Sequence, residues 1–297
     1  MINLSRPVQK EEELPEVSHV SLTHRGNAGH VVPELLRRGV DVRALVRSEQ
    51  KAVEARARGA RETVVGDLRD PDGLRRAMDG VDGVFHINPA FAPAEADLGV
   101  SVVRAAEAAG VGKVVFSSVY HPSSSLTNHA AKRPVEEALY TSDMTFVVLQ
   151  PAMFMQNLTG LADAASKGRV AFPYSARSQM SYVDYRDIAE VAAIGMTESR
   201  LDDGTFELAA GGTVDTVAIA ALFSAALGRP VEASESDPAD VLARMPDGPL
   251  RDGLRRMFSE YDRHGFHGGN PLVLEAVLGR PPRSLAAFVQ ELVSARR

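Results

Sequence analysis

Residues 20–32 constrain the fold more than any other segment, because they have the pattern of a strand, a tight loop and the start of a helix. Such turns hold the pyrophosphate in dinucleotide-binding folds when the loop is rich in glycine. Gly26 and Gly29 occupy the last two glycine positions of a G-x-x-G-x-x-G loop, but the first position is Thr23. A β-branched residue resists the backbone angles that glycine allows. Because two of the three glycine positions are filled, the segment predicts a nucleotide-binding turn. Because the first position is threonine, an ordinary strand-to-helix turn is the alternative.

The residues after this loop complete a strand–helix–strand unit of roughly thirty residues, the context that a dinucleotide-binding loop requires. We expect a helix over 28–38 that ends at Gly39, and a second strand over 41–47. A carboxylate at the end of that strand would hold the adenosine ribose of NAD, but the residue is Arg47. Arginine suits the additional phosphate of NADP; a solvated arginine at a strand end is the alternative.

Strand and helix patterns then keep alternating. Further strands are expected over 61–68, 81–88, 113–119 and 145–149, with helices over 70–78, 95–109 and 132–140. This alternation predicts βαβ units and therefore an α/β fold with a doubly wound parallel Rossmann sheet. The run at 113–119 is almost entirely apolar, so we expect that strand to be buried on both faces.

After Pro151 the alternation loosens and helical patterns dominate. Strands are expected near 180–183, 205–208 and 229–233, with helices over 185–196, 214–227, 238–245, 250–264, 272–278 and 283–293. We therefore expect a polar extension over 1–16, a Rossmann domain over 17–151, and a smaller, mostly helical substrate lobe over 152–297 whose strands return to the main sheet.

Composition narrows the classes of function. With 44% hydrophobic and 24% charged residues, the 297-residue chain has the make-up of a globular protein with a large core. Its net charge is −6 and its lysines and arginines are scattered, so we expect no direct nucleic-acid partner. It contains no cysteine, which fits a cytoplasmic protein. No apolar run reaches the ~20 residues of a membrane helix, so no membrane partner is expected.

Seven segments that occur in order along the chain resemble the NmrA-like family of atypical short-chain dehydrogenase/reductases. They are residues 30–36, 42–47, 65–68, 114–118, 150–157, 182–189 and 278–284. The resemblance implies an NAD(P)-binding Rossmann domain, a C-terminal substrate lobe and a small-molecule substrate. Family members include NADPH-dependent quinone and azo-type reductases, and regulators that bind NADP without turning it over.

The resemblance also implies a cofactor site. It places Gly26, Asn27 and Ala28 at the pyrophosphate, Arg47 at the adenosine phosphate, Asp67 and Leu68 beside the adenine, Asn88 and Pro89 under the ribose and nicotinamide, and Lys132 at the nicotinamide ribose. The loop departs from the pattern at Thr23, which replaces the first glycine and intrudes on the phosphate approach, and at His24 and Arg25, which replace small residues. Arg25 either adds charge to a phosphate or fills the vacant position. We therefore expect NADP(H) to bind weakly, or no cofactor to bind at all.

The tyrosine that donates a proton in the classical members stands four residues before the lysine, and here that position is Asn128. Tyr120 and His121 follow the fifth expected strand and are candidate acids, since one can donate a hydrogen bond and the other changes charge near neutral pH. A polar surface loop is the alternative for both. Ser117 or Ser118 matches the position of the family's catalytic serine, with Ser118 as the catalytic candidate; a serine there can equally cap backbone at a strand end. His129 is a further candidate or a solvated helix start.

Phe154, Met155 and Asn157 are candidates for the substrate pocket, together with Met153; core packing is an equal alternative for the apolar ones. His264 and His267 lack a third ligand at metal-site spacing, so we expect no metal.

Three functions stay open at this point. The first is an NADPH-dependent reductase of a small apolar carbonyl or quinone-like substrate, and the second is an NADP-sensing regulatory protein; Arg47 and Lys132 favour these two. The third is an enzyme that has lost the cofactor and catalyses a cyclisation, elimination or isomerisation, for instance in secondary metabolism. Its catalytic residue would be Tyr120, His121 or Lys132, and Lys132 is a catalytic candidate as well as a cofactor ligand. Thr23, His24 and Arg25 favour this third function.

Overall fold

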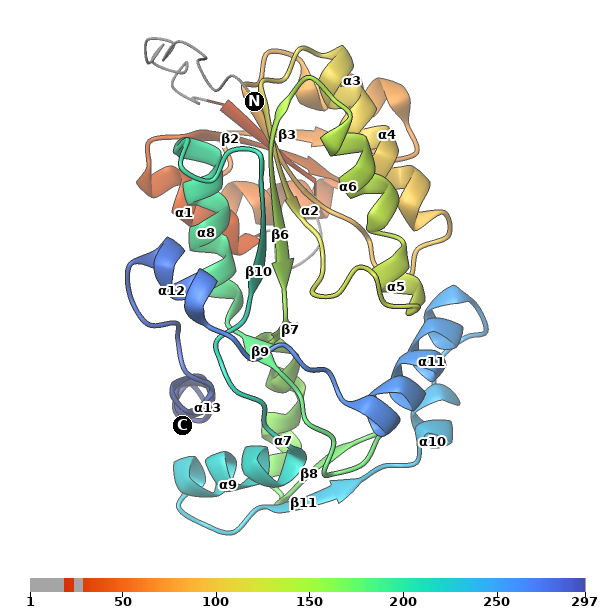
Figure 1. The fold of residues 1–297 in the computed structure, drawn as a ribbon, viewed down its shortest axis with the longest axis vertical. Helices are drawn as coiled ribbons and strands as arrows, with labels where there is room; N and C mark the ends of the chain where they lie inside the picture. The colour runs from red at the N-terminus through yellow and green to blue at the C-terminus, as the bar shows by residue number, and fades with distance from the viewer. Residues whose placement is uncertain (1–18, 24–28, 297) are drawn as a thin grey trace, which may run out of the picture.

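A seven-stranded parallel sheet forms the centre of the structure, a computed structural model that describes residues 19–23 and 29–296 (Figure 1). The strand order is β10-β6-β5-β4-β1-β2-β3. The bounds are β1 (His19–Thr23), β2 (Asp41–Val46), β3 (Glu62–Val65), β4 (Gly83–Ile87), β5 (Lys113–Ser117), β6 (Thr145–Pro151) and β10 (Gly204–Leu208). The chain reverses its direction of travel between β1 and β4, the place where doubly wound sheets bind ligands. The predicted Rossmann sheet is confirmed.

Helices cover both faces of this sheet. One face carries α3 (Pro71–Met78), α4 (Glu95–Ala108) and α6 (Arg133–Tyr140), and the other carries α1 (Val31–Arg37), α2 (Glu49–Ala57) and α8 (Tyr185–Thr197). All five residues of β5 are buried between the two layers, as its apolar sequence predicts. Val114 and Phe116 of β5 belong to the core under α3, α4 and α6, and Val115 belongs to the core under α1 and α8.

Helix α2 and a short strand, β8 (Arg169–Phe172), were not predicted from the sequence. Only Ala52 of α2 is buried, so the helix carries almost no apolar stripe to recognise. What begins it is a cap: the Ser48 hydroxyl accepts a hydrogen bond from the Lys51 backbone N–H at 3.3 Å. Among the described residues, strand β8 pairs with β11 (Glu232–Glu235) alone. Because this pair is not buried on both faces, the short sequence of β8 lacks the continuous apolar pattern of a buried strand.

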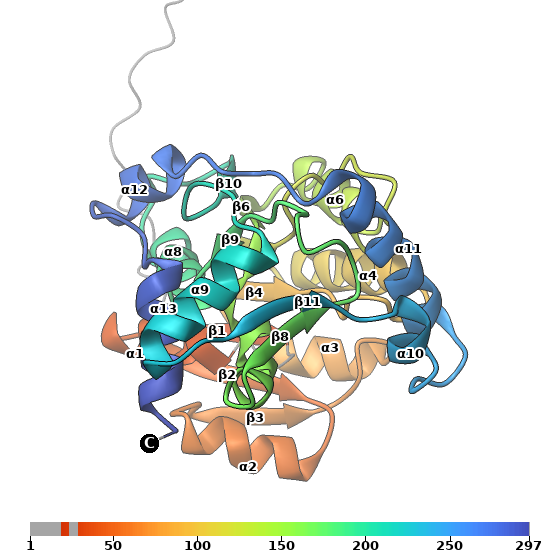
Figure 2. The same ribbon diagram turned by 90° about the horizontal axis from the view of Figure 1, so that it is seen from below.

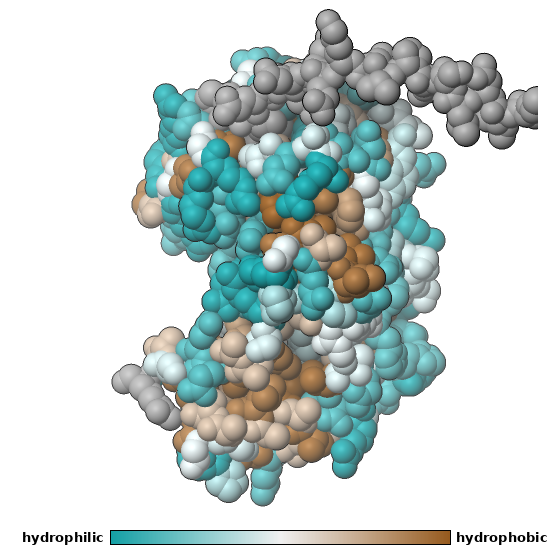
Figure 3. Space-filling model, turned by 60° about the vertical axis from the view of Figure 1, so that its left-hand side comes forward, coloured by the Kyte–Doolittle hydropathy of each residue, from teal (hydrophilic) through white to brown (hydrophobic). Residues whose placement is uncertain are grey.

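The chain beyond β6 builds a second layer of structure below the carboxyl ends of the main strands. It contains β7 (Met153–Phe154) paired with β9 (Tyr182–Val183), η2 (Met155–Leu161), α7 (Ala162–Ala165), α9 (Thr216–Leu227), α10 (Pro238–Leu242), α11 (Pro249–His264), α12 (Leu272–Leu278) and α13 (Leu285–Ser294). Helices α9 and α13 lie on one side of the β8–β11 pair, and α10 and α11 on the other (Figure 2). A notch in the space-filling outline separates this region from the main sheet (Figure 3).

Buried charges tie the C-terminal segment to α8. Asp187 is fully buried; its carboxylate accepts hydrogen bonds from Arg280 Nη2 at 2.9 Å and from the Arg283 backbone N–H at 2.7 Å. Two of the segments that carry the family resemblance, 182–189 and 278–284, therefore meet at one carboxylate. The division into domains at residue 151 stays a prediction, since β10 and α8 lie beyond it in sequence and pack in the main sheet layers. No helix in the described part of the chain is long and apolar enough to cross a membrane.

Candidate functional site

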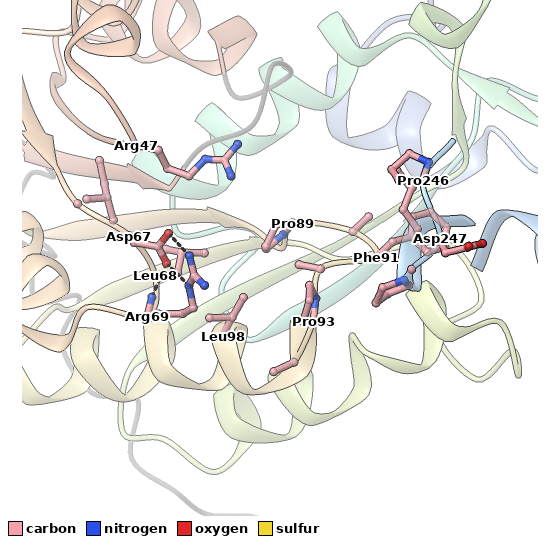
Figure 4. A pocket seen from close by; sticks show the side chains of 18 residues that line it. Arg47, Asp67, Leu68, Arg69, Pro89, Phe91, Pro93, Leu98, Pro246 and Asp247 are labelled. Atoms are coloured by element: carbon pink, nitrogen blue, oxygen red, sulfur yellow. Dashed lines mark hydrogen bonds and ion pairs between the residues drawn. The ribbon is translucent and has the colours of Figure 1, made fainter. Parts of the chain in front are cut away.

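A cavity of about 550 Å³ opens at the carboxyl ends of β2, β3 and β4 (Figure 4). Its walls come from four segments that are distant in sequence: the end of β2, residues 66–69 after β3, residues 89–94 after β4, and residues 246–250 at the start of α11, with Leu98 of α4. Such an edge beside the β1–β4 reversal is where open α/β sheets place their ligands. We therefore take this cavity as the candidate functional site.

One end of the cavity is charged. Arg47 follows β2, and Asp67 and Arg69 follow β3; we call these three residues the arginine end (Figure 4). The Arg69 guanidinium donates to both Asp67 oxygens, from Nε to Oδ1 at 2.8 Å and from Nη2 to Oδ2 at 2.9 Å. These hydrogen bonds hold the pKa of the Asp67 carboxyl well below its usual range, and the charge of Arg47 adds to the effect. Arg47 itself has no hydrogen bond or ion pair with any residue that the structure describes.

The rest of the cavity is mainly apolar. Leu68 and Leu98 lie near the arginine end, and a run of rings and prolines continues toward α11 (Figure 4). This part is lined by Pro89, Phe91, Pro93, Pro246, Pro249 and Leu250. Asp247 adds a carboxylate at the α11 end, and it forms an ion pair with Arg251. A mostly apolar wall with a few charged groups is typical of small-molecule sites.

The loop after β4 holds an unusual backbone conformation. Phe91 and Ala94 have φ angles of 62° and 56°, in the left-handed region that costs a residue with a Cβ atom about 1 kcal/mol or more. The Phe91 backbone N–H donates to Glu95 Oε2 at 2.7 Å, which fixes the loop. The Phe91 ring lies against Gly253 of α11, where an added Cβ atom would collide with it. The loop therefore locks the cavity wall to α11.

Lys132, the lysine expected at the nicotinamide ribose, is buried just before α6. Its ammonium forms an ion pair with Glu95, whose side chain is 4% exposed, and donates to the Asn128 backbone carbonyl at 3.1 Å. Asn88 is buried on the other side of Glu95: its Nδ2 donates to the Glu95 carbonyl at 3.2 Å, and its Oδ1 lies 2.6 Å from His86 Nε2. We call His86, Asn88, Glu95 and Lys132 the buried network.

Histidine 86 is held neutral in this network. Its side chain is buried and its ring is stacked on Phe116, with ring centroids 5.6 Å apart. Burial lowers the pKa of His86 to about 4, and the nearby charge of Lys132 acts in the same direction. Neutral His86 can therefore donate from Nε2 to Asn88 Oδ1.

Ser118 is buried and does not line the cavity. Its hydroxyl donates to Glu136 Oε1 of α6, which also accepts from Gln150 Nε2 at 3.0 Å. This arrangement joins β5, β6 and α6.

Tyr120, His121 and His129 gather beside Phe266, outside the cavity lining. Burial raises the pKa of the Tyr120 phenol, and the carboxylate of Glu207 adds to this. His121 lies 2.6 Å from the His267 carbonyl, so its Nε2 carries a proton. His129 is buried, and burial lowers its pKa.

The three substrate-pocket candidates have different surroundings. Phe154 is half-buried and its ring packs edge-on against Tyr185, with centroids 4.7 Å apart. Met155 is 1% exposed and belongs to the core, and Asn157 is exposed. None of the three lines the 550 Å³ cavity.

The structure thus brings Arg47, Asp67, Leu68 and Pro89 together in one cavity, with Asn88 and Lys132 buried behind its wall. Strand β1 ends at Thr23, as predicted, but Arg25, Gly26, Asn27 and Ala28 lie outside the described residues. All these site assignments stay predictions.

Sequence reasoning missed several contributors to the site, among them Arg69, Phe91, Glu95, Leu98 and residues 246–250. Only the last has a recognisable local signal, since Pro-Asp-Gly-Pro is a turn sequence. Within the described part of the chain, no cluster of three histidine or carboxylate side chains could hold a metal ion.

The sequence profile of the NmrA-like family matches residues 26–288. The chain belongs to the NmrA-like family. Among the relatives of this NmrA-like protein, NAD(P)H azoreductase of Xenophilus azovorans is 31% identical over 274 residues, which cover 89% of this chain and 94% of that enzyme. Quinone oxidoreductase 2 of Escherichia coli (strain K12) is 26% identical over 273 residues, covering 90% and 96% of the two chains.

Solved structures give the same fold for this NmrA-like protein. The NADPH-dependent quinone oxidoreductase QOR2 of Escherichia coli, complexed with NADPH, superimposes with a TM-score of 0.78 at 25% identity, over 92% of this chain and 99% of that one. The Citrobacter sp. triphenylmethane reductase complexed with NADP(H) gives a TM-score of 0.80 at 20% identity, over 92% and 99%.

Proposed function

We propose that this protein is an NADPH-dependent reductase of a small, apolar carbonyl or quinone-like compound. The observation that carries the proposal is the cavity at the ends of β2, β3 and β4, which joins an apolar wall to Arg47, an arginine without an ion-pair partner among the described residues. Relatives that match nearly the whole chain are an NAD(P)H azoreductase and a quinone oxidoreductase, which supports a reductase. Neither relative's name supports the cofactor-independent alternative.

The described residues fit the adenosine half of NADPH. No described residue takes up a hydrogen bond of the Arg47 guanidinium, and an arginine guanidinium matches phosphate geometry. Leu68 and Leu98 offer apolar surface beside it for a planar base. When bound, NADPH would supply the hydride for reduction.

Lys132 is suited to hold the far ribose. Its ammonium has three N–H groups, and the two partners found among the described residues, Glu95 and the Asn128 carbonyl, leave one for a hydroxyl. Because Glu95 fixes the lysine, that N–H has a defined direction. Lys132 would thus position a sugar rather than move a proton.

Tyr120 is the best-supported proton donor among the candidates. Its phenol is protonated at neutral pH, as in any tyrosine that is not strongly acidified, and Tyr120 follows β5 at the carboxyl edge of the sheet. A carbonyl or quinone oxygen that receives a hydride develops negative charge and needs such a donor. His121 contacts the Tyr120 ring edge-on, with centroids 4.4 Å apart, and would hold it in place.

The proposal is tested by titrating the purified protein with NADPH and NADH by fluorescence, and by following NADPH oxidation with benzoquinone as the substrate. We expect NADPH to bind more tightly than NADH and benzoquinone to be reduced. A Tyr120→Phe variant should bind NADPH normally and lose turnover. A protein that binds neither nucleotide would contradict the proposal.

A further inference from the structure

The arginine end contains the carboxylate of Asp67 at the place where the phosphate of NADPH is expected to bind. Asp67 lies in the same cavity wall as Arg47, and Arg47 is close enough to influence the pKa of its carboxyl. Strands β2 and β3 are in register, with Val46 opposite Val65, so the residues that follow each strand emerge side by side. An ionised carboxylate here would repel a phosphate and attract the arginine meant to bind it.

Arg69 removes this conflict. The Arg69 guanidinium donates two parallel hydrogen bonds of 2.8 and 2.9 Å to the Asp67 carboxylate, and the Arg69 backbone N–H donates to Asp67 Oδ1 at 2.9 Å. Both carboxylate oxygens are thus occupied by a residue two positions away in the chain. Arg47 stays without an ion-pair partner among the described residues, even though Asp67 is near.

We propose that Arg69 determines the preference for NADPH over NADH by neutralising Asp67 and so keeping Arg47 free for the ribose phosphate. The inference rests on the proposed function and adds to it a residue that acts through another. Summed over the three side chains, the arginine end carries two positive charges and one negative charge. Without Arg69 the sum is zero, and Asp67 would pair with Arg47.

The chemistry of the two nucleotides explains why only one of them should respond. The adenosine ribose of NADPH carries a phosphate, whose negative charge requires an excess of positive charge nearby. The same ribose in NADH carries two neutral hydroxyl groups, and a free carboxylate can accept hydrogen bonds from them. Loss of Arg69 should therefore weaken the binding of NADPH and leave the binding of NADH unchanged or slightly stronger.

The test measures the dissociation constants of NADPH and NADH for the full chain and for the variants Arg69→Ala, Asp67→Asn and Asp67→Asn/Arg69→Ala. We expect Arg69→Ala to weaken NADPH about tenfold or more, equivalent to ~1.4 kcal/mol, with NADH within about twofold. The double variant should recover most of the lost NADPH affinity, because no carboxylate is left to compete for Arg47.

Arg75→Ala is the matched control, since Arg75 of α3 is an exposed arginine 3.8 Å from Asp72 and does not line the cavity. It should change neither constant. Equal weakening of both nucleotides by Arg69→Ala, or no weakening, would overturn the inference while leaving the reductase in place. A double variant as weak as Arg69→Ala would also overturn it, because Arg69 would then contact the phosphate directly. A wild-type protein that binds neither nucleotide would instead overturn the proposed function.

Discussion

At the arginine end both arginines are exposed, Asp67 is half-buried, and Arg47 has no partner among the described residues. In the buried network every named side chain is enclosed and bonded to a neighbour. The loop 89–94 lines the cavity and contacts the buried network through the Phe91 backbone N–H, which donates to Glu95 Oε2. Solvent-exposed charged groups with free hydrogen-bond donors can bind a ligand and cost the folded protein little stability. Enclosed charges must be paired, since an unpaired one is costly. The arginine end is therefore suited to bind a ligand, and the buried network is suited to hold side chains such as Lys132 in a fixed position.

The largest effect should follow from breaking the buried ion pair. Lys132→Met leaves Glu95 as an unpaired buried charge, and we expect a loss of about 3–5 kcal/mol in the free energy of unfolding. Denaturant unfolding measures this. The Lys132→Met/Glu95→Gln double variant should regain much of the loss. The matched control is Lys51→Met, which removes an exposed ion pair of 2.7 Å with Glu54 and should cost well under ~1 kcal/mol. Similar losses at the two sites would erase the contrast between the regions.

A smaller loss is expected where the loop 89–94 meets α11. Gly253→Ala places a methyl group into the Phe91 ring, and overpacking of this kind costs about 1–3 kcal/mol. Thermal unfolding measures the loss, and NADPH titration measures any change in the cavity. Phe91→Ala should relieve the collision, so the double variant should lose less than the sum of the single changes. Additive losses would mean that the ring and Gly253 do not interlock.

The next effect concerns the glycine loop. If the branched side chain of Thr23 obstructs the phosphate, Thr23→Gly should strengthen NADPH binding about tenfold, or ~1.4 kcal/mol. The change should act on NADH equally, since both nucleotides share the pyrophosphate. Tight NADPH binding by the wild type that does not change in the glycine variant would mean that the turn tolerates threonine.

The smallest effect at neutral pH concerns His86. Its pKa is about 4 in the folded protein against an ordinary 6.5, so the unfolded chain binds more protons between these values. The free energy of unfolding should therefore fall as the pH drops from 6.5 to 4, and His86 should have no such effect above that window. His86→Asn should flatten the slope in chemical unfolding curves at several pH values. His264→Asn is the control, because His264 is 71% exposed. An unchanged slope in His86→Asn would show that this histidine is not buried neutral.

The sequence predicts the fold far better than the site. Periodic apolar residues mark each strand of the main sheet, and the apolar run of β5 correctly predicts burial on both faces. Arg47 could be assigned because a strand end fixes its place in any Rossmann sheet. Glu95, Phe91 and residues 246–250 could not, because their roles come from contacts between segments far apart in sequence. The Lys132–Glu95 pair spans 37 positions, and neither residue alone indicates a partner.

The central claim is that the cavity binds the phosphorylated adenosine of NADPH through Arg47, and titration of Arg47→Ala tests it most directly. Dissociation constants for NADPH and NADH are measured by fluorescence on the wild type and the variant. We predict that NADPH binds about tenfold or more weakly to the variant, ~1.4 kcal/mol, while NADH is unchanged, so that the preference between them disappears. Equal losses for both nucleotides, or no loss for either, would contradict the account.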